Sequence, residues 1–598
     1  MYELAAGDLN EEQKEAIYES QSVFLTACPG SGKTRTLTFK AALELSNLES
    51  HRRYVGAITY THRAADEIEE RTLELGIDTT QLWVGTIHSF CLEWILKPYG
   101  IYHDALVNGF SIINGHEREV ILDRICRQYT GHRVTHWDCD YYYENGALKL
   151  KSPVASKHAV IRAVLQTYFE ELRRERKVDF DQMLEYASQI LERQPVVARV
   201  LSSLFAWLLV DEYQDTQKVQ YSIISAILNA GSGASRVFIV GDPNQAIYGS
   251  LGGYAIDPDE FRDMIGIPIR QMSLRRNYRS TSRLIHYFSN YADKPAVLVA
   301  SADHQNDLSL ISYDNAIHRN DLEGELVRLI RHSIETIGIS PHEICVVAPW
   351  WVQLAAMTRR LTVALPEYNF NGPGTTPFSR DIDNFWYKVA RVGLTESSPG
   401  MYVRRLRWAR EILTDLEAAG VDIAGHTSRT LLKLSNSIKC EASDGLTFLH
   451  DYFDELFARM GLSWDVASTL VDQRTAFVDS SEARIEKLRR DGAAALSDVE
   501  SFRQVFKPKS GITISTIHGV KGAEFDTVIG FAILEGMVPH FSEQDPETSS
   551  NKLMYVVGSR ARRNLHLLSE RGRVDGRGSE YRSTKVLRQC QFEYDEVQ

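Results

Sequence analysis

Short apolar runs alternate with amphipathic stretches along most of the chain. The runs occupy residues 22–27, 54–59, 207–210, 237–240, 344–348, 512–515 and 527–531. Between them, apolar residues recur at spacings of three and four, a period that predicts helices. Strands that alternate with helices form parallel sheets. We therefore expect an α/β fold, and the spread of the runs predicts two parallel sheets.

Two long segments interrupt this alternation. Residues 97–180 and 392–508 contain few strand candidates and are predicted to be mainly helical, with basic helical faces such as EELRRERK at 170–177. We interpret them as helical insertions, one in each of two α/β domains. The predicted domains comprise 1–96 with 181–275, and 276–391 with 509–598.

A glycine-rich loop follows the first apolar run. Residues 27–34 read ACPGSGKT, with alanine at the first position of the P-loop pattern. Glycines let backbone N–H groups cradle a phosphate at the start of the next helix. In this pattern Lys33 bridges the β- and γ-phosphates of ATP, and the Thr34 hydroxyl completes the shell of a Mg²⁺ ion. Alone, the motif also fits a chance glycine turn. The predicted cradle is Ala27, Cys28, Pro29, Gly30, Ser31 and Gly32.

An acidic motif strengthens the prediction of an ATP site. The run at 207–210 ends directly in DEYQDT, where Asp211 could hold Mg²⁺ and Glu212 could polarise the attacking water. The run at 237–240 ends in GDPNQAIYG, whose Gln245 could sense the γ-phosphate. Together with the P-loop, these motifs predict a hydrolase that uses ATP and Mg²⁺.

Composition narrows the class of protein. Hydrophobic residues make up 43% and charged residues 24%, as in ordinary globular domains. The net charge of −12 means that nucleic acid would have to meet local basic patches. Seven cysteines without a C-x-x-C pair argue against a zinc ribbon or a disulfide framework. No signal peptide and no apolar run of ~18–20 residues are evident. We expect a soluble cytoplasmic protein without a membrane partner.

Further motifs resemble a known family. LNEEQKEAI, ITYTHRAADEI, VGTIHSF, LRRNYRS, STIHGVKGAEFDTV and LMYVVGSRA accompany the three motifs above. Their order and approximate spacing resemble those of UvrD/Rep/PcrA-like superfamily one DNA helicases, from residue 9 to about residue 570. The resemblance implies two RecA-like motor domains, each carrying a mainly helical insertion, that close over ATP.

The resemblance also assigns nucleotide contacts. It implies that Gln13 reads the adenine edge, Arg35 lies near the base and ribose, Tyr278 stacks on adenine and Glu524 contacts the nucleotide. Arg279 and Arg560 resemble the arginines that reach the γ-phosphate from the second motor domain. Such arginine fingers deliver positive charge only when the cleft closes. An isolated arginine would ordinarily be interpreted as one partner of a surface ion pair. The surrounding motifs instead favour a role at the γ-phosphate for both arginines.

A single-stranded DNA track is implied as well. Single strands are gripped by cationic grooves and by aromatic rings that stack on bases. Tyr60 and Tyr248 stand where the family has stacking aromatics, although core packing is the ordinary role of an isolated ring. Polar contacts to the strand are expected from Thr61, His62, Thr86, His88, Thr516 and His518.

Three departures from the family pattern bear on function. Ser250 stands where the family has a stacking tryptophan, and Tyr254 is a hypothetical replacement. The acids and arginines that precede the last motif are replaced by SSNK at 549–552. The second insertion is also shorter than the corresponding subdomain of processive relatives.

The main functional prediction is a 3′-to-5′ DNA translocase and helicase that binds single-stranded or tailed duplex DNA. A helicase-nuclease resembling RecB or AddA does not fit, because the short segment after Arg560 has no room for a nuclease domain. A DNA-sensing ATPase subunit remains open. It would resemble the UvrD-like subunits of Gabija anti-phage systems, which partner an OLD-type nuclease. A further alternative is a P-loop ATPase whose hydrolysis does not depend on nucleic acid. The oligomeric state stays open.

Overall fold

The computed structural model describes residues 9–129, 133–373, 378, 381, 384–490, 497–506, 511–543 and 545–596. The chain forms two compact units. The first unit comprises Met1–Ile112, Leu122–Glu367 and Ile512–Gln598, and it contains both large sheets. The second unit comprises Ile113–Ile121 and Tyr368–Gly511.

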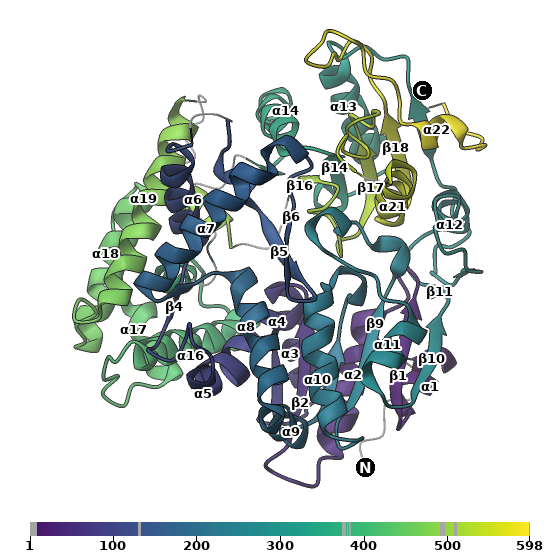
Figure 1. Ribbon diagram of the computed structural model, residues 1–598. Coiled ribbons are helices and arrows are strands. Elements are labelled where there is room, and N and C mark those ends of the chain that lie inside the picture. The colour runs from purple at the N-terminus through teal and green to yellow at the C-terminus, as the bar shows by residue number, and fades with distance from the viewer. Residues whose placement is uncertain are drawn as a thin grey trace. The chain divides into compact units, whose positions relative to one another are not determined.

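The first sheet runs in the order β10-β1-β9-β8-β2-β3, and every described pairing is parallel (Figure 1). Its strands are β1 (Ser22–Ala27), β2 (Tyr54–Thr59), β3 (Leu82–Thr86), β8 (Phe205–Val210), β9 (Arg236–Gly241) and β10 (Ile269–Leu274). Its helices include α1 (Glu11–Tyr18), α2 (Lys33–Ser46), α3 (His62–Glu74), α8 (Phe180–Arg193), α9 (Pro195–Leu204), α10 (Lys218–Ala230) and α11 (Pro258–Ile265). We call this sheet and its helices the first α/β domain.

Helices cover both faces of the first sheet, which explains its continuous apolar strands. All six residues of β8 are buried. Along β8, Leu208 packs into one core with α8, α9 and α10, whereas Trp207 and Leu209 pack into another with α1, α2 and α3. A strand buried on both faces reads as an unbroken apolar run rather than as an alternation.

The second large sheet has the order β13-β18-β17-β14-β16 within the first unit, again with parallel pairings. Its strands are β13 (Ile311–Asp314), β14 (Ile344–Ala348), β16 (Ile512–Thr516), β17 (Phe525–Gly530) and β18 (Ala561–Leu568). Its helices include α12 (Ser282–Ser289), α13 (Leu322–Arg331), α14 (Trp351–Ala364), α21 (Pro546–Ser559) and α22 (Lys585–Gln589). This second α/β domain confirms the expected α/β class with two parallel sheets.

The first inserted segment contains more strand than the helical pattern predicted. It includes α6 (Gly115–Cys126), α7 (His158–Glu175), and the strands β4 (Ser111–Ile112), β5 (Tyr141–Glu144), β6 (Ala147–Leu150) and β7 (Lys177–Val178). β5 and β6 form an antiparallel hairpin through Asn145 and Gly146, which have φ of +50° and +74°. An Asn-Gly pair between alternating apolar residues favours such a hairpin turn, so the signal was present in the sequence.

The second unit is helical. It consists mainly of α15 (Phe385–Gly393), α16 (Tyr402–Ala418), α17 (Ser428–Ser437), α18 (Gly445–Met460), α19 (Ser468–Arg490) and α20 (Val499–Gln504). Aromatic and aliphatic side chains from these helices share one core, with Trp386 fully buried in it. No helix in the described part of the chain is long and apolar enough to span a bilayer.

Candidate active site

The loop after β1 needs two of its glycines for conformation and space. Gly30 and Gly32 have φ of +66° and +78°. A Cβ on Gly30 would lie 2.5 Å from Cβ of Arg279, and one on Gly32 would lie 2.8 Å from Nε2 of Gln13. α2 begins at Lys33, and no side chain caps its N-terminus. Its first N–H groups are therefore available to an anion, as a phosphate cradle requires.

The rest of the predicted cradle is held by hydrogen bonds inside and beyond the loop. Ala27 ends β1, and Oγ of Ser31 donates to the carbonyl of Cys28 at 2.8 Å. Burial raises the pKa of Cys28 to about 12, so this thiol stays neutral. The carbonyl of Pro29 accepts from Nδ2 of Asn277 at 2.8 Å. That bond ties the loop to the segment that follows β10.

The residues expected around adenine converge on the same loop. Nε2 of Gln13 donates to the carbonyl of Ser31 at 2.9 Å, and Gln13 forms a capping box with Asn10 at the start of α1. Nδ2 of Asn10 donates to the hydroxyl of Tyr278 at 2.8 Å, and the Tyr278 side chain is 42% exposed. Arg35 lies in the first turn of α2, its guanidinium over a phenylalanine ring one turn later. The structure thus brings Gln13, Tyr278 and Arg35 together around the loop.

Two acids follow the tip of β8 beside the loop. Glu212 has φ of +52°, and its Oε1 lies 3.8 Å from Nζ of Lys33. Burial acts to raise the pKa of Glu212, but Lys33 and Lys521 outweigh it and hold the pKa well below its usual range, with help from a hydrogen bond from Gln214. The pKa of Asp211 is raised by burial and by the charge of Glu212. Glu212 is therefore the carboxylate kept ionised without a metal.

The donor set beside the loop fits Mg²⁺ held jointly with a nucleotide. Asp211 is buried at the strand tip, and Thr34 lies half-buried in the first turn of α2. The described residues include no group of three or more acidic, histidine or cysteine ligands. Mg²⁺ in nucleotide sites needs few protein ligands because phosphates and water supply the others. Thr34 and Asp211 would hold the ion, whose positive charge would stabilise the ionised form of Asp211.

The predicted ATP cleft has two walls, and the P-loop and the acids after β8 lie on the first. The two predicted arginine fingers lie on the opposite wall, which belongs to the second α/β domain. Arg560 is 1% exposed, and its Nη2 donates to Oε1 of Gln245 at 2.9 Å. Gln245 in turn donates to Oδ2 of Asp242 at 2.8 Å. Nε of Arg279 donates to Oε2 of Glu524 at 2.6 Å. Burial, reinforced by the charge of Arg279, lowers the pKa of Arg560 to about 9. Gln245 therefore joins the walls, and Glu524 positions Arg279.

A buried ion pair, to which the sequence analysis assigned no role, also connects the walls. Nζ of Lys521 lies 2.6 Å from both carboxylate oxygens of Asp215 and 2.6 Å from the carbonyl of Gln245. The two side chains are 8% and 1% exposed. Both residues lie in the quoted motifs, but their pairing is not visible in either motif. Asn277 was missed for the same reason.

Two aromatic residues predicted to bind DNA stack on each other. The ring centroids of Tyr60 and Tyr248 lie 5.2 Å apart, with 29° between the planes. The hydroxyl of Tyr248 donates to the carbonyl of His518 at 3.3 Å, and Nε2 of His518 donates to the carbonyl of Ile247 at 3.2 Å. Nζ of Lys521 lies 5.2 Å from the centroid of the Tyr248 ring. Lys521, which contacts the carbonyl of Gln245, thus also contacts the stack.

The remaining predicted DNA contacts lie at or just after the carboxyl ends of strands, and those whose side chains are described have structural roles. Thr61 and Thr86 are the N-caps of α3 and α4 (Ile87–Phe90). His88 packs edge-on against an aromatic ring at the start of α8, and Oγ1 of Thr516 accepts from a backbone N–H at 3.0 Å. The side chain of His62 lies outside the described part of the chain. Contact of these residues with DNA stays a prediction.

In the loop that lacks the family tryptophan, the ring of Tyr254 is held by other contacts. Ser250 lies in the short 3₁₀ turn Gly249–Leu251 and is exposed. The hydroxyl of Tyr254 donates to Oε2 of Glu260 at 2.5 Å, and Nζ of Lys218 lies 4.5 Å from its ring centroid. These contacts argue against Tyr254 as a replacement stacking platform.

Comparisons with known proteins agree with this arrangement. The family model of the UvrD/REP helicase N-terminal domain matches residues 9–255, and that of the UvrD-like helicase C-terminal domain matches residues 477–571. ATP-dependent DNA helicase UvrD1 of Mycobacterium tuberculosis is 30% identical over 298 residues, which cover 46% of this chain and 38% of that relative. ATP-dependent DNA helicase PcrA of Staphylococcus aureus is 22% identical over 628 residues, covering 95% of this chain and 84% of that protein. The chain belongs to the UvrD/REP family of superfamily one DNA helicases.

Proposed function

We propose that this protein is an ATP-dependent DNA translocase and helicase that uses Mg²⁺ and moves 3′ to 5′ along single-stranded DNA. Membership of the helicase family supports the reaction class, and the polarity is carried over from that family. The observation that carries the proposal is the linked set of contacts at Gln245. Its side chain meets Arg560, and its carbonyl meets Lys521.

The residues divide the chemistry between the two walls. On the first wall, the N-terminus of α2 and Lys33 would hold the phosphates, and the ionised Glu212 would orient and polarise water. On the second wall, Arg560 and Arg279 would supply positive charge where negative charge develops in hydrolysis. Because this charge arrives only with the closed cleft, hydrolysis would be tied to domain closure.

Closure would reach the DNA track through a short path. Gln245 and Tyr248 lie three residues apart in one loop, and Lys521 approaches both. Any movement of Lys521 relative to the first domain therefore acts on the Tyr60–Tyr248 stack. A base that enters this stack would replace the contact between the two tyrosine rings with a contact between a ring and the base. Stacking of one base on an aromatic ring contributes ~1–3 kcal/mol.

Strand displacement tests this proposal. A labelled duplex with a 3′ tail should be unwound in the presence of ATP and Mg²⁺, and a matched duplex with a 5′ tail should not. Lys33→Ala should abolish displacement because it removes the phosphate contact. Unwinding of the 5′-tailed substrate alone would refute the polarity.

A second candidate function is a DNA-sensing ATPase subunit that partners an OLD-type nuclease and unwinds little by itself. Exposed Ser250 and the engaged ring of Tyr254 favour it, because they leave one fewer stacking platform for ratcheting a strand. This reading expects DNA-stimulated ATP hydrolysis without strand displacement, together with co-elution of the nuclease in size-exclusion chromatography. Vigorous unwinding by the isolated chain would refute it.

A further inference from the structure

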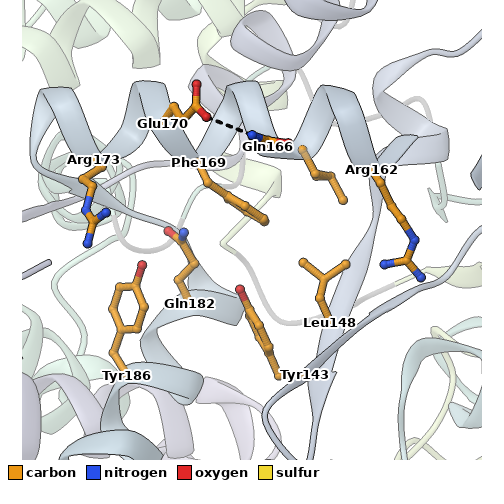
Figure 2. Close-up of a pocket in the computed structure, with 10 residues that line it drawn as sticks. Tyr143, Leu148, Arg162, Gln166, Phe169, Glu170, Arg173, Gln182 and Tyr186 are labelled. Atoms are coloured by element: carbon orange, nitrogen blue, oxygen red, sulfur yellow. Dashed lines mark hydrogen bonds between the residues drawn. The ribbon is translucent and has the colours of Figure 1, made fainter. Parts of the chain in front are cut away.

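A cavity of about 470 Å³ lies in the first unit, between one face of α7, the β5–β6 hairpin and α8. Three aromatic rings line it, and they come from three different elements: Phe169 from α7, Tyr143 from β5 and Tyr186 from α8. Figure 2 shows these rings around the middle of the cavity, with Phe169 opposite Tyr143. None of them belongs to the ATP site or to the Tyr60–Tyr248 stack.

Positive charge lies at both ends of this cavity. Arg162 and Arg173 stand on the same face of α7, at opposite ends of the lining (Figure 2). Both are exposed, and neither guanidinium hydrogen-bonds to another side chain within the described residues. The neighbouring acid, Glu170, also lines the cavity, and its carboxylate accepts from Nε2 of Gln166 at 3.2 Å (Figure 2). Two arginine side chains are thus left to meet an anion.

The walls of the cavity are fixed by a buried carboxylate. Asp179 accepts from the hydroxyl of Tyr141 at 2.6 and 2.8 Å and from that of Tyr168 at 3.1 Å. Asp179 also caps α8 through a capping box with Gln182. These contacts hold α7, the hairpin and α8 in place before any ligand arrives. A preformed site lowers the ordering cost of binding.

The cavity is also connected to the predicted DNA track. Phe180, the first residue of α8, packs edge-on against His88, with ring centroids 5.6 Å apart. Tyr186 lies on the same helix, fewer than two turns further on. α8 therefore runs from a predicted strand contact to the wall of the cavity.

We propose that this cavity holds one unpaired base of a DNA single strand, with phosphates of the nucleotides that flank it on the two sides at Arg162 and Arg173. Aromatic rings stack on any base, and a guanidinium matches phosphate geometry. A mononucleotide carries its phosphate on one side only, so arginines at both ends favour an internal nucleotide of a strand. The inference rests on the proposed function and adds to it a second base-binding site outside the motor track.

Photo-crosslinking tests the position of the base. The full-length protein is irradiated with a thymidine oligonucleotide that carries one 5-iododeoxyuridine, and the adducts are mapped by mass spectrometry. Adducts on Tyr143 or Tyr186 are expected, in addition to any on Tyr60 or Tyr248. Adducts confined to Tyr60 and Tyr248 would overturn the inference. Labelling of the cavity by 5-iododeoxyuridine monophosphate, undiminished by excess oligonucleotide, would replace the strand by a free nucleotide.

Charge variants test the phosphate contacts. Arg162→Gln/Arg173→Gln should weaken oligonucleotide affinity about tenfold and flatten the slope of log affinity against log salt by about 1.4, at 0.7 per phosphate of a single strand. Arg127→Gln/Arg174→Gln is the matched control, because it removes two exposed arginines of the same insertion that do not line the cavity. ATP hydrolysis without DNA should be unchanged in both.

This experiment distinguishes failure of the proposed function from failure of the cavity inference. If the wild-type protein shows no DNA-stimulated hydrolysis and no oligonucleotide binding, the proposed function fails, and the cavity inference fails with it. If the wild-type protein responds to DNA but both double variants bind with equal affinity and salt slope, the cavity inference alone is wrong.

Discussion

Replacing Asp215 with asparagine removes one half of a buried ion pair that joins the two α/β domains. Lys521 is then left at 8% exposure without its carboxylate partner, with the carbonyl of Gln245 as an acceptor at 2.6 Å. Removing one partner of a buried pair costs about 3–5 kcal/mol. Because the cost falls on the closed arrangement, 3 kcal/mol at the lower end corresponds to roughly a 100-fold loss in turnover.

Replacing Lys521 with methionine should be milder. Burial already raises the pKa of Asp215 to about 7, against the opposing charge of Lys521. Without Lys521, Asp215 takes up a proton near neutral pH and avoids a buried charge. We expect a loss of turnover of about tenfold or less, because protonating Asp215 near its pKa costs no more than about one pKa unit, or about 1.36 kcal/mol. The double variant Asp215→Asn/Lys521→Met should be no worse than Lys521→Met, because neither change then leaves a charge unpaired.

Steady-state ATP hydrolysis at saturating single-stranded DNA measures this cycle. The reasoning also sets a pH dependence: as pH falls through 7, Asp215 is protonated, the pair is lost and wild-type turnover should decline. The double variant should lack that component of the acid limb. Additive losses from Asp215→Asn and Lys521→Met, multiplying to about 1,000-fold, would refute the reasoning.

Two further predictions follow from the geometry of the walls and the track. Gly30→Ala should lower DNA-stimulated hydrolysis at least about 100-fold, because the new Cβ would lie 2.5 Å from Arg279 on a φ that disfavours alanine. The control is Gly115→Ala, because a Cβ at Gly115 would have no neighbouring atom within 4 Å. Equal activity of the two variants would contradict the close approach of Arg279 to the P-loop. Tyr248→Ala should weaken single-strand affinity between about 5- and 150-fold in fluorescence anisotropy, the worth of one stacked base. Tyr254→Ala should leave affinity unchanged, and the reverse order of effects would move the stacking platform to Tyr254.

The sequence predicts the central strands well because they are buried on both faces. β1 and β2 have the predicted bounds, and β8 extends its predicted run by two residues. β10 was missed because its sequence, IRQMSL, lies at the edge of the sheet and forms neither an apolar run nor a strict alternation. β18 was missed because two arginines follow its first residue, although its later residues are buried. Half-exposed and charged stretches carry little of the apolar signal on which such predictions depend.

The candidate site divides in the same way between local and distant information. Lys33 and Glu212 are visible in the sequence because a tight loop and an acidic strand end are local features. The pairing of Lys521 with Asp215 joins positions 306 residues apart, and no local pattern encodes it. The cavity beside α7 likewise depends on three separate elements. Each needs the folded chain to bring its parts together.

We propose that the two walls form one ATP cleft whose hydrolysis responds to single-stranded DNA. Steady-state ATP hydrolysis with and without single-stranded DNA, for the wild-type protein and Glu212→Gln, tests it most directly. We expect at least about tenfold stimulation by DNA and, because the water-polarising carboxylate is lost, a fall of about 10²-fold or more in Glu212→Gln. Wild-type hydrolysis that is indifferent to DNA, or an undiminished rate in Glu212→Gln, would contradict it.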